Sequence, residues 1–128
     1  MSNSVIKKDP WFASVMIDKR ELHEGTGTIV LTIASELTNA DLKFLKDVFA
    51  REIEAGYRNV ILDCKHIDML FSVHVGIIWS NCQKFRKIKG DVRFLNMKES
   101  VQAVLERLGL LKVIKVFDDI DDAIASFN

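Results

Sequence analysis

One serine in the middle of the chain has neighbours that could support nucleophilic chemistry. Ser72 has His74 two residues after it and Asp68 four residues before it. A hydrolytic triad also needs an oxyanion hole and a sharp strand-to-helix turn of the GxSxG kind, whereas the local sequence is LFSVH. The spacing therefore argues against a serine hydrolase, and we predict no catalytic residue at this position.

Ser72 also stands where a strand-like run gives way to a helical pattern. This position predicts that its hydroxyl is the helix N-cap, a contact whose loss typically costs ~1 kcal/mol. The same geometry could host a phosphate, because its charge of about −2 would lie at the positive end of the helix dipole. The neighbours Met69, Leu70, Phe71 and Val73 are apolar. If this loop docks on a partner, a phosphate there would weaken the contact, because the charged group would have to lose its water.

Other side chains with ligand chemistry are explained better by structure. Cys64, His66, His74 and Cys82 are separated by one, seven and seven residues, unlike a compact zinc motif. We expect two core thiols and two loop imidazoles. The acidic segment Asp118–Asp122 lacks the glycine turn and distal glutamate of a calcium loop and suits a helix N-terminus. Neither GxGxxG nor GxxxxGK[ST] occurs, so we predict no metal and no cofactor.

Length and charge limit the class of protein. The 128 residues, 48% of them apolar, are enough for one domain. Because 18 basic and 18 acidic side chains balance, we expect no nucleic-acid partner. No apolar segment reaches the roughly 20 residues of a membrane span, and residues 1–10 lack the apolar stretch of a signal peptide. We therefore predict a cytoplasmic protein without membrane insertion.

The elements that must position Ser72 alternate between strand and helix patterns. The order is ββαβαβαβα, which predicts an α/β fold with a mostly parallel central sheet of about five strands and about four helices. The first strand is expected as an added edge strand, followed by a loop over 18–27. The predicted strands are 12–17, 28–33, 59–64, 91–96 and 113–117. The predicted helices lie in 38–56, 72–90, a segment around 101–108 that Gly109 closes, and the tail 118–128.

Three of these helices carry clear end signals or core stripes. Thr38 is the expected N-cap of the first helix, Asp41 completes a capping box and Gly56 ends the helix. The residues expected to face the core are Val75, Ile78, Trp79, Cys82 and Phe85 in the second helix, and Val101, Val104, Leu105 and Leu108 in the third.

Several runs of residues carry a resemblance to a known family. They are SELTNAD, VILDCKHIDMLFSVHVGII, GDVRFLN and VQAVLERLGLLKVIKVFDDIDDAI. They resemble the STAS domain of bacterial anti-sigma factor antagonists, most clearly where Val104, Leu105, Gly109 and Leu110 meet the family pattern in order. The resemblance implies a single STAS domain over residues 12–128, preceded by an N-terminal extension over 1–11.

The resemblance also implies a regulatory role without enzymatic activity. In the family, a serine after the central strand is phosphorylated by a serine-protein kinase that is also the anti-sigma factor, and Ser72 aligns with it. The unphosphorylated form binds that kinase and frees the sigma factor, and the phosphorylated form releases it; this partner switching regulates transcription in bacteria. The implied partner-binding residues are Met69, Leu70, Phe71, Ser72, Val73, His74, Val75, Gly76 and Thr38.

The chain also departs from the family pattern. Phe71 stands where the family has Asp, Val73 where a second Ser or Thr is common, and His74 where Gly is usual; in the earlier motif Ser35 replaces Gly and Thr38 replaces Asp. These differences favour an alternative, a divergent STAS scaffold subunit of a stress-sensing or transporter complex without a phosphate cycle. The apolar loop could equally support a homodimer.

Overall fold

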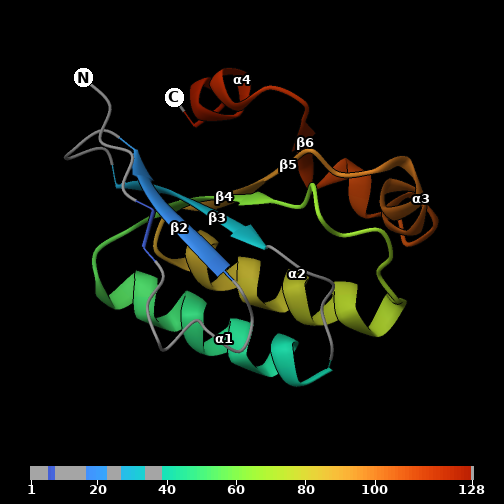
Figure 1. Cartoon of the computed structure of the whole chain (residues 1–128), viewed down its shortest axis with the longest axis horizontal. Coiled ribbons are helices and arrows are strands. Elements are labelled where there is room, and N and C mark those ends of the chain that lie inside the picture. Colours follow the sequence, from blue (N-terminus) through green and yellow to red (C-terminus); the bar gives the residue numbers. More distant parts are fainter. Residues whose placement is uncertain (1–5, 8–16, 23–26, 34–38, 128) are drawn as a thin grey trace.

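A computed structural model describes residues 6–7, 17–22, 27–33 and 39–127 of the chain (Figure 1). These residues contain one six-stranded sheet, in which the strands lie in the order in which they follow one another along the chain. The strands are β1 (Ile6–Lys7), β2 (Ile17–Leu22), β3 (Thr28–Ile33), β4 (Asn59–Asp63), β5 (Asp91–Leu95) and β6 (Lys115–Phe117).

The sheet is parallel over most of its width. Strands β3 to β6 pair in parallel, whereas β1 and β2 are added antiparallel at one edge. The connecting helices are α1 (Asn39–Glu54), α2 (Ser72–Lys87), α3 (Glu99–Arg107) and α4 (Ile120–Ala125), with a short 3₁₀ helix, η2 (Leu110–Lys112), before β6. The predicted α/β fold with a mostly parallel sheet is confirmed.

The two faces of the sheet are covered by different helices. Helices α1 and α2 lie side by side below the sheet in Figure 1, and α4 lies above it. Alternate strand residues therefore enter separate apolar clusters. Toward α1, α2 and α3 point Ile29, Leu31, Val60, Leu62, Val92 and Phe94; the other face is formed by Val30, Ile61 and Leu95 with Ala123 of α4. The central strands are buried on both faces, as their continuous apolar sequence predicts.

The predictions for the N-terminal part were partly wrong. The expected strand 12–17 lies outside the described residues except for Ile17, and Asp18–Leu22, expected in a loop, belongs to strand β2. Its backbone pairs with β3 from Ile17 opposite Ile33 to Leu22 opposite Thr28. Strand β1 lies in the expected N-terminal extension and pairs with β2. The predicted boundary between this extension and the domain, at residue 12, remains a prediction.

The observed ends of α1 and α3 can be compared with the ends predicted from the sequence. Helix α1 ends at Glu54, and Gly56 has a φ of +99°, so the predicted glycine stop is confirmed. Thr38, its expected N-cap, lies outside the described residues. Helix α3 ends at Arg107, which leaves Leu108 45% exposed and makes its expected core position wrong. In the described ranges, no helix combines the length and apolar character needed to span a bilayer.

Candidate functional site

The segment between β4 and α2 leaves the sheet at the carboxyl end of a central strand, where open α/β sheets usually bind their ligands. The start of this loop is tied to β5, because the Cys64 N–H donates to the Leu95 carbonyl oxygen over 2.9 Å. Its middle is tied to the start of α3. There the Ser100 hydroxyl donates to the Asp68 carbonyl oxygen over 2.9 Å, and Lys98 pairs with the Asp68 carboxylate. The loop is thus held at both points.

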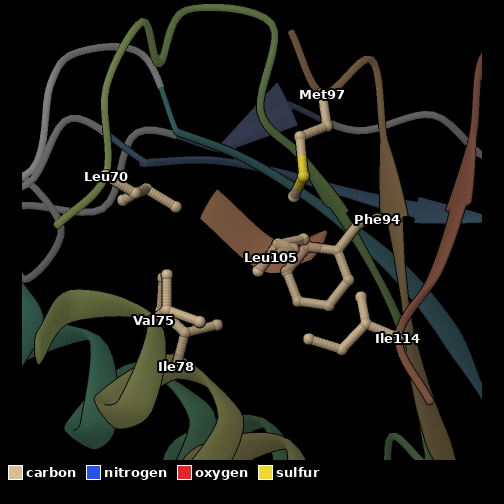
Figure 2. A pocket seen from close by; sticks show the side chains of 7 residues that line it. All are labelled: Leu70, Val75, Ile78, Phe94, Met97, Leu105 and Ile114. Carbon is tan, nitrogen blue, oxygen red and sulfur yellow. The ribbon is translucent and has the colours of Figure 1, made fainter. Parts of the chain in front are cut away.

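Leu70 anchors the end of this loop in the core. Its side chain faces a small cavity of about 10 Å³ between α2, β5 and α3, which is lined entirely by apolar side chains (Figure 2). A space of this size holds at most one water molecule, and an apolar lining offers that water no hydrogen bond. The cavity is therefore a packing defect and no ligand site. Its lining consists of Leu70, Val75, Ile78, Phe94, Met97, Leu105 and Ile114.

Helix α2 begins one residue earlier than the predicted cap requires. Phe71 occupies the N-cap position, with φ −87° and ψ 158°, and Ser72 is the first helical residue. The prediction that Ser72 caps α2 was therefore wrong. Phe71 makes no side-chain cap bond, and the first turn contains no acidic residue. The helix start relies instead on backbone bonds, in which the His74 and Val75 N–H groups donate to the Phe71 carbonyl oxygen over 2.9 and 3.1 Å.

The hydroxyl of Ser72 is accessible. Its side chain is exposed, and no described residue forms a hydrogen bond with its oxygen. The backbone N–H groups of Ser72 and Val73 also have no acceptor among the described residues, as expected at an uncapped helix start. A phosphoryl group on this hydroxyl would find two free donors and the positive end of a sixteen-residue helix beside it.

Exposed apolar side chains surround this hydroxyl. Met69, Phe71 and Val73 are 60%, 60% and 63% exposed, and Ile77 on the next turn is 36% exposed. We call these four residues the apolar patch. The Phe71 ring stands edge-on to the His74 ring, with centroids 5.4 Å apart and planes at 78°, so the exposed ring has a defined contact. Large apolar side chains gathered on one surface commonly mark protein interaction sites.

The structure brings together only part of the predicted partner-binding set. Met69, Phe71, Ser72, Val73 and Gly76 are exposed on one surface. Leu70, His74 and Val75 are buried, which corrects the expectation that His74 is a loop imidazole. Thr38 lies outside the described residues. Ile77 was missed, although its spacing of four from Val73 on the predicted helix could have identified it.

An open groove continues from this patch along α1 and α2. Lys46 comes from α1, and α2 supplies the other lining residues. The place of Lys46 and Lys84 in one groove depends on how the two helices pack. The lining of the groove is Lys46, Val73, Gly76, Ile77, Ser80, Asn81 and Lys84.

Neither cysteine suits nucleophilic chemistry. Cys64 and Cys82 are both buried free thiols, as the sequence predicts. Burial raises the pKa of the Cys64 thiol well above its ordinary value and raises that of Cys82 to about 12. Both thiols are therefore protonated at neutral pH, and the thiol is much less reactive than the thiolate. Within the described ranges, no three His, Cys, Asp or Glu side chains form a group able to hold a metal ion.

The fold and the loop define a class of protein. The family model for the STAS domain matches residues 19–123, so the chain belongs to the STAS domain family. BtrV of Bordetella bronchiseptica, named as an anti-sigma factor antagonist, is 23% identical over 102 residues, which cover 80% of this chain and 88% of BtrV.

Solved structures with the same fold include proteins of two kinds. The anti-sigma factor antagonist SpoIIAA in its unphosphorylated form matches with a TM-score of 0.66 and 20% identity, over 81% of this chain and 91% of SpoIIAA. The murine anion transporter Slc26a9 matches with a TM-score of 0.68 and 18% identity, over 82% of this chain but 18% of the transporter. At these identities the likeness shows the fold alone.

Proposed function

We propose that this chain is a cytoplasmic, non-enzymatic anti-sigma factor antagonist that binds an anti-sigma factor with serine kinase activity and is released when that kinase phosphorylates Ser72. The observation that carries the proposal is the accessible Ser72 hydroxyl among the exposed side chains of the apolar patch. Its family membership and the name of its relative BtrV support the same role.

The apolar patch supplies the attractive part of this switch. Met69, Phe71 and Val73 each expose more than half of their surface, so a partner that covers them removes apolar area from water. Aromatic side chains at the centre of an interface are frequent energetic hot spots. Phe71 is the aromatic candidate here, because its contact with buried His74 limits the freedom lost on binding.

Phosphorylation supplies the repulsive part. A phosphate on Ser72 would carry about −2 charges between Phe71 and Val73, and covering them would require desolvating that charge. The fold itself would tolerate the phosphate, because free backbone donors and the positive helix end lie beside the hydroxyl. The same modification therefore weakens docking while leaving the domain folded.

A direct test uses the purified ATPase-type serine kinase encoded closest to this gene. Incubation with ATP followed by peptide mass spectrometry should show one phosphate, on Ser72, and Ser72→Ala should remain unmodified. A kinase that binds the chain but leaves Ser72 unmodified would contradict the phosphate cycle and leave the docking proposal standing.

Substitution of Ser72 separates the proposed switch from a scaffold role. Ser72→Asp should weaken kinase binding at least about tenfold in calorimetry, because a carboxylate must be desolvated in the interface. Ser72→Asn, of similar shape without the charge, should stay close to the wild type. Equal affinities for both variants would favour the alternative, a STAS scaffold without a phosphate cycle. The observation favouring that alternative is Phe71, an apolar residue where the family has Asp.

A further inference from the structure

The groove between α1 and α2 contains a glycine that the packing of this chain does not require. Gly76 lies in the second turn of α2, where glycine is less favourable than alanine. A methyl group at this position would meet no heavy atom within 4 Å beyond its own helix backbone, judged over the described part of the chain. The missing side chain therefore leaves room for something outside this chain to approach the helix backbone.

The groove also carries uncompensated positive charge. Lys46 is exposed and Lys84 is half-buried, and neither forms an ion pair with a described residue. They lie on separate helices, and the apolar side chains Val73 and Ile77 line the same groove. This combination suits an occupant that offers carboxylates and an apolar side chain together.

A buried amide adds a hydrogen-bond acceptor. The Asn81 side chain is 3% exposed, and its Nδ2 donates to the Ile77 carbonyl oxygen over 3.0 Å. Its Oδ1 has no donor among the described residues, although Asn81 lines the groove. Buried polar atoms are usually paired, so an N–H group brought by an occupant of the groove would satisfy this oxygen.

The length and openness of the groove favour a polypeptide over a small anion. Val73 and Lys84 are three turns apart on α2, which is roughly 16 Å along the helix axis. A single phosphate or carboxylate cannot reach both ends, whereas about five residues of extended chain or three helical turns can. The groove shares Val73 and Ile77 with the apolar patch, so one partner can cover both surfaces.

We propose that this groove receives an acidic segment of the anti-sigma factor. Two of its carboxylates pair with Lys46 and Lys84, an apolar side chain packs on Val73 and Ile77, and its backbone passes close to Gly76 and donates to the Asn81 Oδ1. This inference rests on the proposed function and extends it, because it assigns a charge pattern to the partner and places half of the interface away from Ser72.

Charge reversal tests the occupant. In calorimetric titration with the purified neighbouring kinase, Lys46→Glu combined with Lys84→Glu should weaken binding at least about tenfold. Affinity of the wild type should fall as salt rises, since salt screens such pairs. The matched control is Lys87→Glu, an exposed lysine on the same helix outside the groove, which should stay within about twofold of the wild type.

Gly76→Ala tests the close approach independently of charge. The variant should melt at a higher temperature than the wild type, because alanine favours the helix, yet bind the kinase at least about fivefold more weakly. A raised melting temperature excludes misfolding as the cause of that loss. If Gly76→Ala and the double lysine variant both bind the kinase as well as the wild type does, the groove proposal is wrong and the proposed function stands. A wild type that binds no such kinase would overturn both.

Discussion

Helices α2 and α4 begin in opposite ways. At α4, the Asp119 carboxylate accepts hydrogen bonds from the N–H groups of Asp121 and Asp122 over 2.7 and 3.3 Å, and both of those residues are acidic. At α2, Phe71 occupies the same position with no cap bond, and no acid follows in the first turn. One helix thus satisfies its N-terminal amides internally, and the other leaves them available.

The difference follows from how each helix is held. Helix α4 has six residues, too few to be stable alone, and rests on the second face of the sheet through buried Ala123 and half-buried Ile120 and Ile124. Helix α2 has sixteen residues and a buried stripe that includes Val75, Ile78 and Phe85. Packing can therefore hold α2 without a cap. The uncapped start of α2 is free to take part in binding and modification.

The far end of α2 and the end of α4 are linked through Asp91 and Arg93. Asp91, at the start of β5, accepts from the Arg86 Nε of α2 over 3.0 Å and from the Arg93 Nη1 over 2.6 Å. Buried Arg93 in turn donates to the Ser126 hydroxyl over 2.8 Å and lies 4.5 Å from the Phe127 ring centroid, just after α4. Asp91 therefore couples the two helices that begin so differently.

The largest expected effect comes from removing this shared carboxylate. Asp91→Asn should lower the free energy of unfolding by about 1–3 kcal/mol at pH 7, since it leaves buried Arg93 without its ionised partner. Urea titration measures the loss. Asp118→Asn, an exposed carboxylate close to α4, is the control and should change stability by less than about 0.5 kcal/mol.

The same carboxylate gives a pH dependence of known sign. Burial alone would raise the pKa of Asp91, but hydrogen bonds from Arg93, Arg86 and the Val92 N–H outweigh it and hold the pKa below its ordinary value. The folded state then binds fewer protons than the unfolded state in acid. The stability difference between wild type and Asp91→Asn should be full above about pH 4 and shrink as the pH falls through the lowered pKa. A difference that stays constant down to pH 2 would contradict this coupling.

The next effect concerns the capped helix alone. Asp119→Ala should cost about 1 kcal/mol of unfolding free energy, because the N–H groups of Asp121 and Asp122 lose their acceptor. The amides of α4 should lose hydrogen-exchange protection while those of α2 keep theirs. Asp118→Ala serves as the control. Unchanged protection in α4 would mean that its packing, like that of α2, makes the cap dispensable.

The contrast between these helices was only partly predictable from the sequence. Regular apolar spacing was sufficient to place Val75, Ile78 and Phe85 of α2 in the core, because burial of one helix face repeats with the helical period. The N-cap was misplaced by one residue, because a serine before an apolar stripe carries a strong cap signal whether it lies at the cap or one position later. The packing of the buried face of α2 decides at which of these two positions the serine lies, and the sequence around Ser72 does not show that packing.

Other features depend on contacts between distant segments. The polar sequence of β2 resembles a loop, and its backbone pairing with β3 and β1 makes it a strand. The groove needs Lys46 and Lys84 from neighbouring helices, so no motif in either helix could reveal it. The exposed apolar patch was predictable in outline, because the apolar residues Met69, Phe71 and Val73 lie close to Ser72 in the sequence. The burial of Leu70 between them was not predictable.

The smallest expected effect tests whether the uncapped start of α2 favours negative charge. Val73 is the second helical residue and mostly exposed, so Val73→Glu should unfold with a free energy about 0.3–1 kcal/mol higher than Val73→Gln, which has the same shape without the charge. Urea titrations at low salt measure the difference, which should disappear in 1 M NaCl and below about pH 3, where the glutamate is protonated. Equal stabilities at low salt would remove the electrostatic reason for expecting a phosphate on Ser72 to be tolerated. A gain would mean that the start of α2 stabilises added negative charge, as tolerance of a phosphate on Ser72 requires.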